Sequence, residues 1–295
     1  MKIVIGIATI NRPVVLRQML ENLLLQIRAP DHIVICGSKP ADTEGIKSAF
    51  PSIDLIYANA GASAQRNAII RASVDADVIL FLDDDFFPQQ DYILALERHM
   101  AEHPKTVVAT GRVIADGING PGLSVRDAMA LLAADWSQYR DRPAANGQST
   151  EFSGYGCNMA VRMAEIRRAR LAFDEALPLY SWQEDVDLSR RLAVFGNVVK
   201  LDAARGVHLG VKSGRGSGVK LGYSQVANPL YLVSKRAGYP LGRAAGHISK
   251  NIAKNLVRSA WPEPYVDRRG RLLGNLFAIW DLCNGRMSPQ RVLDL

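Results

Sequence analysis

An apolar run over residues 78–82, Val-Ile-Leu-Phe-Leu, stops abruptly on three adjacent carboxylates, Asp83, Asp84 and Asp85. Its length and its β-branched and aromatic content are typical of a strand buried on both faces, so the acids fall where that strand leaves a sheet. Adjacent like charges repel one another unless a cation lies among them, and Mg²⁺ or Mn²⁺ binds carboxylate oxygens together with substrate phosphates. The tripeptide indicates either a metal-bound phosphorylated substrate or a solvated acidic turn.

The first hundred residues alternate strand and helix patterns at the spacing of βα units. Strands are expected at residues 2–8, 32–36, 54–58 and 77–82, and helices at 13–26 and 64–72. Pro13 suits the first turn of its helix, where no backbone N–H is needed. This alternation predicts a mainly parallel sheet with helices on its faces, in which ligands bind outside the carboxyl ends of the strands. Residues 9–12, 36–38 and 83–85 lie at such ends.

Beyond residue 90 the predicted elements become shorter and the loops longer. Helices are expected at residues 91–102 and 184–195, and strands at 106–114, 152–162 and 198–209. Turn-forming residues predict loops at 116–124 and 140–150, and a flexible basic loop at 212–218.

Composition excludes several classes of protein. No apolar stretch approaches the roughly 20 residues of a membrane-spanning helix. Residues 3–10 resemble the start of a secretion signal, but an Asn-Arg-Pro sequence interrupts them and no cleavage site follows, so we expect a cytoplasmic protein. The three cysteines, Cys36, Cys157 and Cys283, are far apart and odd in number, which predicts partly buried thiols without a disulfide framework or a zinc site.

Positive charge is concentrated in the C-terminal third. Residues 211–295 contain 14 Lys or Arg and four acidic residues, which indicates a polyanionic partner such as nucleic acid, an anionic membrane surface or the phosphates of a ligand. Residues 241–261 predict an amphipathic helix followed by Trp261. Its basic stripe is Arg243, His247, Lys250, Lys254 and Arg258, and its apolar stripe is Ile248, Ile252 and Leu256. Such a helix either docks on an anionic membrane or packs on the rest of the chain with a solvated basic face.

Several separate motifs follow one another along residues 2–210. They are Ala-Thr-Ile-Asn-Arg-Pro at 8–13, Gly-Ala-Ser-Ala-Gln-Arg-Asn-Ala at 61–68, Phe-Leu-Asp-Asp-Asp-Phe-Phe-Pro at 81–88, Gly-Cys-Asn-Met-Ala-Val-Arg at 156–162, and the segment 173–188 that begins Phe-Asp-Glu and ends Glu-Asp-Val-Asp-Leu. Through these motifs the chain resembles the family 2 glycosyltransferases, inverting enzymes that use nucleotide-sugars and have the GT-A fold.

The resemblance implies a fold class and a domain plan. The class is α/β, with a Rossmann-like, mainly parallel central sheet flanked by helices. A catalytic domain would span residues 1–210, with a nucleotide-sugar-binding half at 1–115 and an acceptor-binding half at 116–210. A basic, mostly helical extension would follow at 211–295.

The resemblance also implies that the acidic tripeptide holds the donor through Mn²⁺ or Mg²⁺. Asp85 would bind the metal, which neutralises charge on the leaving nucleoside diphosphate, and Asp83 or Asp84 would contact the ribose or base. His208 lies where related enzymes often place a histidine near the metal, although a lone histidine is as often structural. The other implied donor-binding residues are Thr9, Asn11, Arg12, Ser38, Arg66 and Asn67. From its type alone, Arg66 is equally well explained as a solvated helix residue.

By the same resemblance, Asp185 would be the general base that takes a proton from the acceptor hydroxyl, with Glu184 as a supporting residue. Acids at a helix start are also explained by the helix dipole and by pairing with arginines further along the helix. That explanation accounts less well for Trp182, since an aromatic side chain beside a carboxylate is a common sugar-binding arrangement. Trp182 and Asn158 are therefore expected to bind the acceptor.

The implied function is transfer of one sugar from a nucleotide-sugar, by default UDP-linked, to a saccharide or lipid-linked saccharide in polysaccharide biosynthesis. The Gln-x-x-Arg-Trp motif of processive members is missing from the sequence. Many family members carry a base-binding aspartate after the second strand, where this chain has Cys36, Gly37 and Ser38. The expected location is the cytoplasm, with peripheral association at the inner face of the membrane through residues 241–261, and nucleic acid is not an expected partner.

Two other functions explain part of the sequence. A phosphatase of the haloacid dehalogenase type would use Asp83 as a phosphorylated nucleophile and Asp85 as an acid. Its motif normally follows the first strand of the domain and has Thr or Val where Phe87 stands. A non-enzymatic polyanion-binding protein would account for the basic C-terminal third and leave the acids without a role. Sugar nucleotidyltransferases need a Gly-rich basic loop after the first strand, and this chain has none.

Overall fold

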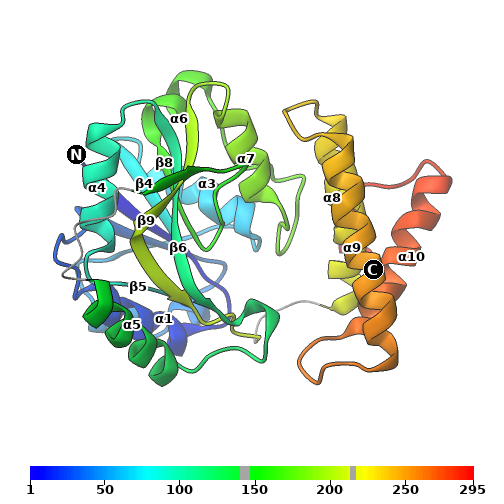
Figure 1. Cartoon of the computed structure of the whole chain (residues 1–295), viewed down its shortest axis with the longest axis horizontal. Helices are drawn as coiled ribbons and strands as arrows, with labels where there is room; N and C mark the ends of the chain where they lie inside the picture. The colour runs from blue at the N-terminus through cyan, green and yellow to red at the C-terminus, as the bar shows by residue number, and fades with distance from the viewer. Residues whose placement is uncertain (140–146, 213–216) are drawn as a thin grey trace.

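A computed structural model describes residues 1–139, 147–212 and 217–295 of the chain. One curled sheet lies at the centre of the N-terminal part, with helices on its faces, and three long helices stand beside it (Figure 1). The strand order is β3-β2-β1-β4-β8-β6-β9-β5, and β7 pairs with β9 off this path.

The first four strands are parallel, as the sequence predicts. They are β1 (Ile3–Ala8), β2 (His32–Gly37), β3 (Asp54–Tyr57) and β4 (Val78–Asp83). The helices among them are α1 (Pro13–Leu23), the short α2 (Ile46–Ala49) and α3 (Ala62–Ala72), with a 3-10 turn η1 (Pro40–Thr43). The carboxyl ends of β1, β2 and β4 therefore meet along one edge of the sheet.

The second half of the sheet mixes strand directions. Its strands are β5 (Phe86–Pro88), β6 (Thr106–Asp116), β7 (Gln148–Thr150), β8 (Asn158–Arg162) and β9 (Asn197–His208). Only β6 and β9 pair in parallel, whereas β8 runs antiparallel to β4 and β6, and β5 and β7 run antiparallel to β9. The helices are α4 (Tyr92–Glu102), α5 (Val125–Tyr139), α6 (Met163–Ala169) and α7 (Glu184–Leu192), with η2 (Gly117–Asn119).

Three expectations for this half need correction. The strand expected at 152–162 begins only at residue 158, because the preceding turn carries Gly154 and Gly156 and the backbone of each bonds to a residue of α7. The loop expected at 140–150 contains β7, and residues 140–146 lie outside the described ranges. Helix α5 was not expected at all, since only Ala128 and Leu132 on it are buried and its apolar stripe is weak.

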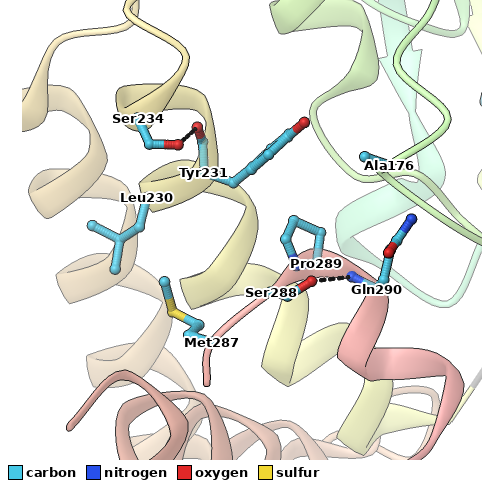
Figure 2. Close-up of a pocket in the computed structure, with 8 residues that line it drawn as sticks. All are labelled: Ala176, Leu230, Tyr231, Ser234, Met287, Ser288, Pro289 and Gln290. Atoms are coloured by element: carbon cyan, nitrogen blue, oxygen red, sulfur yellow. Dashed lines mark hydrogen bonds between the residues drawn. The ribbon is translucent and has the colours of Figure 1, made fainter. Parts of the chain in front are cut away.

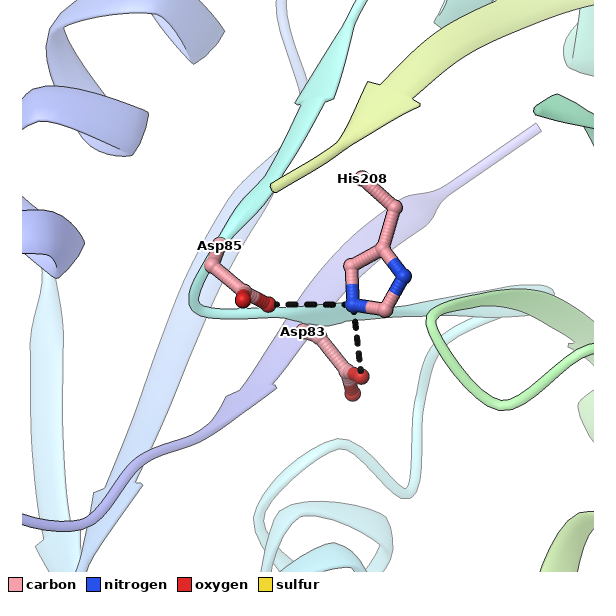
Figure 3. A group of neighbouring side chains, drawn as sticks. All are labelled: Asp83, Asp85 and His208. Atoms are coloured by element: carbon pink, nitrogen blue, oxygen red, sulfur yellow. Dashed lines mark ion pairs between the residues drawn. The ribbon is translucent and has the colours of Figure 1, made fainter. Parts of the chain in front are cut away.

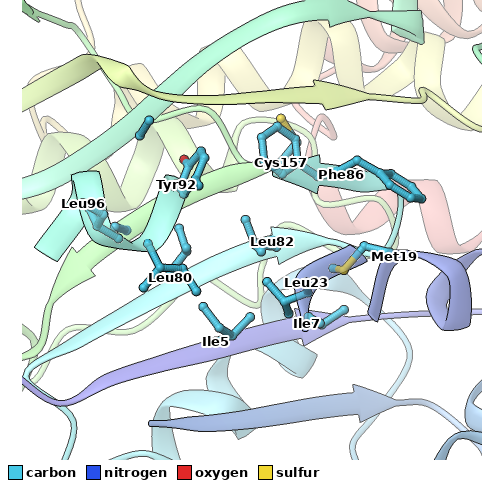
Figure 4. Close-up of a cluster of buried hydrophobic side chains, with 14 of the residues drawn as sticks. Ile5, Ile7, Met19, Leu23, Leu80, Leu82, Phe86, Tyr92, Leu96 and Cys157 are labelled. Atoms are coloured by element: carbon cyan, nitrogen blue, oxygen red, sulfur yellow. The ribbon is translucent and has the colours of Figure 1, made fainter. Parts of the chain in front are cut away.

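The central strand β4 is buried on both faces, which confirms the prediction from its apolar run. Leu80 and Leu82 point into one hydrophobic cluster (Figure 4). That cluster includes Ile5, Ile7, Met19, Leu23, Phe86, Tyr92, Leu96 and Cys157. Ile79 and Phe81 belong to a second cluster on the opposite face of the sheet. The acids at the end of β4 are thus attached to a strand that is packed on both faces.

The chain ends in a small helical bundle of α8 (Gly218–Ser234), α9 (Leu241–Ala260), α10 (Arg268–Cys283) and η3 (Pro289–Leu293), which has its own apolar core. The helix predicted at 241–261 is therefore present, and its Ile248 and Ile252 pack inward against that core. Residues 213–216 of the predicted basic loop lie outside the described ranges. Within the described ranges, no helix combines the length and apolar character that crossing a membrane requires. Cys36 and Cys157 are buried, but Cys283 is exposed, contrary to expectation.

Candidate active site

The three acids meet a histidine because of the way the chain turns after β4. Asp83 is the last residue of β4, and the next two residues turn the chain into β5. Strand β5 pairs antiparallel with β9 so that Phe86 faces His208. The end of β9 is thereby brought to the end of β4, although 125 positions separate His208 from Asp83 in the chain.

Asp83, Asp85 and His208 form a cluster that fits a divalent cation (Figure 3). His208 Nε2 lies 3.3 Å from an Asp85 oxygen and 3.9 Å from an Asp83 oxygen, and one ligand atom of each residue lies within 4.8 Å of the others. Two carboxylates and an imidazole suit Mn²⁺ and similar ions. The structure thus brings together the predicted metal residues Asp85 and His208 and adds Asp83.

Asp116, at the end of β6, orients His208. Its Oδ1 lies 2.9 Å from His208 Nδ1, and its Oδ2 accepts a hydrogen bond of 2.8 Å from the Tyr155 hydroxyl. A carboxylate on the far nitrogen is the usual support of a metal-binding histidine. Burial lowers the pKa of His208, but its hydrogen bonds to Asp116 and Asp85 outweigh that effect and raise the pKa to about 10. No sequence pattern distinguishes Asp116, which is the first residue of the loop predicted at 116–124.

Asp84 is fully engaged by protein groups. Thr9 Oγ1 donates to one carboxylate oxygen at 2.7 Å and Arg12 Nη1 donates to the other at 2.9 Å. Burial raises the pKa of Asp84 to about 7, and Arg12 opposes this. The side chain of Asp83 is 36% exposed, whereas those of Asp84 and Asp85 are 5% and 3% exposed. Of the three acids, Asp83 is therefore the one that a ligand reaches most easily.

Arg66 is buried and joins the acidic tripeptide to α7, so it is not a solvated helix residue. Its Nη1 lies 2.5 Å from Glu184 Oε1, and its Nη2 donates to Asp83 at 3.0 Å and to the Gly156 carbonyl at 2.9 Å. The guanidinium also lies against the rings of Phe81 and Phe173. This residue fixes the position of Glu184 relative to Asp83.

Asp185 stands beside that network at the start of α7. Its two oxygens accept hydrogen bonds of 2.8 Å from the backbone N–H groups of Gly156 and Val186. Burial raises the pKa of Asp185 although these bonds oppose it. Burial, with the neighbouring charge of Asp185, also raises the pKa of Glu184 to about 8, against the effect of Arg66. Asp185 remains partly exposed while Glu184 is buried, so Asp185 is the carboxylate that can accept a proton from a ligand.

The predicted nucleotide residues Asn11 and Ser38 are linked by Asp42, which sequence reasoning missed. The buried Asp42 carboxylate accepts from the backbone N–H of Asn11 at 2.8 Å and from the N–H and hydroxyl of Ser38 at 2.8 Å and 2.7 Å. The position of Asp42 two residues after Pro40 is a recognisable start of a helical turn. Asp42 therefore ties the ends of β1 and β2 together where the family's aspartate is missing.

Two predicted site residues lie in structural positions instead. Asn67 forms hydrogen bonds with both backbone groups of Phe173, and its amide also donates to Glu175. Asn158 has no exposed surface, and its side chain bonds to Thr110 and to the Gly111 carbonyl. The structure does not bring these two side chains to the acids.

Trp182 lies in a loop that the C-terminal helices hold in place. The Trp182 carbonyl accepts a hydrogen bond of 2.7 Å from Asn228 of α8. The next residue, Gln183, donates to the Tyr239 hydroxyl and interacts with His247 Nδ1 of α9, at 3.1 Å and 3.0 Å. The Trp182 and His247 rings are 6.3 Å apart. The start of α7, with Glu184 and Asp185, therefore rests against α8 and α9.

Two surface hollows lie away from the acids. One, of about 380 Å³, is formed by α8, η3 and the loop at Ala176 (Figure 2). The other, of about 360 Å³, lies between α5 and the strands β6 and β9. Neither is lined by any of the three acids, by His208 or by Asp185. These two hollows are therefore separate from the cluster of acids.

Comparison with known proteins places the chain among sugar-transferring enzymes. A sequence model described as glycosyl transferase family 2 matches residues 4–167. No protein with a curated description matches the chain significantly.

Solved structures share the fold. S. aureus TarS 1-349 is 13% identical, with a TM-score of 0.59 over 99% of this chain and 82% of that chain. Its UDP complex matches over 70% of this chain and 59% of that chain, with a TM-score of 0.51 and 14% identity. The mannosyltransferase PcManGT from Pyrobaculum calidifontis, in complex with GDP-Man and Mn²⁺, is 13% identical, with a TM-score of 0.58 over 95% and 87% of the two chains. At identities this low the similarity establishes the fold alone.

The buried position of Arg66 leads to a prediction about stability. Replacing Arg66 with methionine leaves the Glu184 and Asp83 carboxylates without their cation, so the free energy of unfolding should fall by about 3–5 kcal/mol. Urea denaturation at about pH 9, above the pKa of about 8 of Glu184, measures this change. The deficit should shrink as the pH falls, because protonation removes the uncompensated charges.

The double variant Arg66→Met/Glu184→Gln is the matched test, because it removes the carboxylate together with its partner. It should recover part of the lost stability. The exposed Arg71→Met, on the same helix, should change stability little. An Arg66→Met protein as stable as wild type would show that the network does not support the site.

Proposed function

The chain belongs to glycosyl transferase family 2 and has the GT-A fold, and on that premise we propose that it is an inverting transferase. It moves one sugar from a nucleotide-sugar, UDP-linked by default, to a hydroxyl of a saccharide or lipid-linked saccharide. One observation carries the proposal. Arg66 connects Asp83 of the metal cluster to Glu184. Gly156 in turn connects Arg66 to Asp185. The proposed metal site and the proposed general base therefore lie on two sides of one buried network.

On the donor side, Asp83, Asp85 and His208 would hold Mn²⁺ or Mg²⁺. When bound, the ion neutralises charge on the diphosphate that leaves the sugar. Asp116 keeps the ring of His208 turned toward the two acids. Asp84 acts indirectly, because its carboxylate fixes Thr9 and Arg12 at the edge where the diphosphate would lie.

The nucleoside would lie beyond these groups, over the ends of β1 and β2. Asn11 and Ser38 line this edge, and Asp42 fixes the backbone N–H of both residues. Gln65 stabilises the same edge, since its amide donates to the carbonyls of Thr9 and Cys36 at 2.8 Å each. A base-binding edge supported in this way does not need an aspartate directly after β2.

On the acceptor side, Asp185 accepts the proton of the attacking hydroxyl. Each of its oxygens already accepts one backbone N–H, which holds the carboxylate still and leaves a lone pair on each oxygen for a ligand. Its raised pKa brings it closer to neutral pH, where a general base is most effective. Trp182 offers a ring for the acceptor sugar, while Glu184 holds Arg66 and takes no proton from the substrate.

The finer assignments follow from this arrangement. We assign catalysis to residues 1–210. We assign two roles to residues 211–295, which are support of the loop at Trp182 and contact with a membrane. Acceptors used in polysaccharide biosynthesis are carried on lipids at the inner face of the membrane, which is where we place the protein. Only one sugar is transferred in each encounter.

Replacing Asp185 with asparagine should separate binding from chemistry. Asparagine keeps the size of the side chain but is not a base at neutral pH, so transfer should fall by about 10²–10⁴-fold. Binding of UDP in the presence of Mn²⁺, measured by calorimetry, should remain within about twofold, because Asp185 is not part of the metal cluster. A panel of UDP- and GDP-sugars with a saccharide acceptor supplies the transfer assay. An active Asp185→Asn variant, or wild-type turnover that EDTA leaves unchanged, would refute this mechanism.

The pH dependence of transfer should reflect the raised pKa of Asp185. The base works only when deprotonated, so kcat/KM should rise with pH through this pKa and then level off. The acidic limb should lie above the ordinary aspartate value of about 3.9. Donor binding over the same pH range serves as the control for loss of the metal. A kcat/KM that stays constant down to about pH 4 would rule out Asp185 as the base.

Asp116 should be required for metal affinity. Asp116→Ala leaves His208 Nδ1 without its carboxylate, so Mn²⁺ affinity should fall about 10–100-fold. Titration with Mn²⁺ alone, followed by electron paramagnetic resonance, measures the change. Tyr155→Phe is the matched control, because it removes a different side-chain partner of Asp116 and keeps the bond to His208. Equal Mn²⁺ affinities in Asp116→Ala and wild type would show that Asp116 does not orient His208 as a metal ligand.

A further inference from the structure

Helix α10 exposes a continuous apolar face. Four large side chains recur on it at spacings of three and four residues, which places them together on one side of a helix. They are Leu273, Leu276, Phe277 and Trp280, with exposed fractions between 41% and 64%. The opposite side packs on α8 so closely that a Cβ on Gly274 would lie 2.0 Å from a backbone oxygen of α8. The helix is thus anchored on one side and left uncovered on the other.

Helix α9 extends this face. Asn255 donates to Asn275 at 2.9 Å, and Arg269 donates to the Ser259 carbonyl at 3.3 Å, so α9 and α10 form an antiparallel hairpin. Leu256 and Leu276 each follow one of the paired asparagines, which puts both on the same side of the hairpin. Leu256 is 60% exposed. We call Leu256, Leu273, Leu276, Phe277 and Trp280 the hairpin face.

Basic side chains accompany the hairpin face. Arg269 lies one turn before Leu273 on the same side of α10. The exposed Lys250 and Lys254 add positive charge on the other side of α9, which carries His247. Arg286 is exposed just after α10 ends. Helix α9 contains no acidic residue, and the single acid of α10, Asp281, is buried and accepts a hydrogen bond from Tyr223. The hairpin face therefore carries Arg269 and lies on two helices that expose no acidic side chain between their first and last residues.

We propose that the hairpin face docks on an anionic lipid surface. The leucine and aromatic side chains would enter the boundary between headgroups and acyl chains, and the Arg269 side chain would pair with lipid phosphates. A second copy of the chain matches this face less well, because a symmetric contact would bring like charges together. Helix α10 lies on the side of the bundle away from the sheet, so docking leaves the acidic site uncovered (Figure 1). The membrane contact that the sequence predicts for residues 241–261 is therefore proposed for α9 and α10 together.

This inference deepens the membrane contact proposed above for residues 211–295, and it does not depend on the proposed reaction. It is tested by flotation of the full-length protein with vesicles of phosphatidylcholine alone or mixed with phosphatidylglycerol. Wild type should bind the anionic vesicles at least about tenfold more strongly, and high salt should weaken the binding. Leu276→Gln/Trp280→Gln should lose most of it. Leu25→Gln/Val194→Gln, which changes two exposed apolar residues outside the bundle, should bind as wild type does.

Thermal unfolding followed by circular dichroism shows whether each variant is folded, and the midpoint should be unchanged in both. The Asp185→Asn protein should float as wild type does, so failure of the reaction and failure of docking are distinguishable. Wild type that does not float with anionic vesicles would overturn the inference. A dimer in sedimentation experiments that Leu276→Gln/Trp280→Gln dissociates, without vesicle binding by wild type, would assign the face to a second copy instead.

Discussion

The buried guanidinium of Arg66 is the interaction on which the arrangement of the site depends. It reaches Asp83 at the end of β4, Glu184 at the start of α7 and the carbonyl of Gly156 in the turn before β8. These segments are far apart in the chain, and each would carry unsatisfied polar groups into the interior without the shared cation. Gly156 is suited to this position because a Cβ there would lie 3.3–3.5 Å from atoms of Asp185, Glu184 and Arg66. The network thereby sets the geometry between the two sides of the site.

Compensating cations also explain how three consecutive acids remain in a folded protein. Asp83 pairs with Arg66, Asp84 pairs with Arg12, and Asp85 pairs with His208. Each acid therefore has a different nearest partner, and the three partners come from α3, from the start of α1 and from β9. The site is preorganised by the protein before any ligand arrives, which reduces the reorganisation that a donor must drive.

The sequence predicted those parts of the fold that depend on local pattern. Strand β4 and its acids were found because a buried parallel strand is a continuous apolar run, and α9 was found because its stripes follow the helical period. The pairing of β5 with β9, which brings His208 to the acids, joins distant residues through a three-residue strand that has no pattern of its own. Asp42 and Asp116 were missed for a similar reason. Their roles come from the partners that the fold brings to them, and Asp residues in turns are common in any sequence.

The C-terminal helices support the catalytic side as well as forming a surface of their own. Leu179, Ser181 and Gln183 have φ angles of 58°, 51° and 76°, in a left-handed region that costs residues with a Cβ about 1–2 kcal/mol each. Such a backbone persists only where its surroundings hold it, and here α8 holds the loop through Asn228 and α9 holds it through His247. The proposed domain boundary at residue 210 therefore separates two segments of the sequence, although residues after it hold a loop of the catalytic domain in place. Helix α9 contacts the catalytic loop near its start and carries Leu256 of the hairpin face near its end, so one rigid element links the proposed membrane contact to the residues that precede the general base.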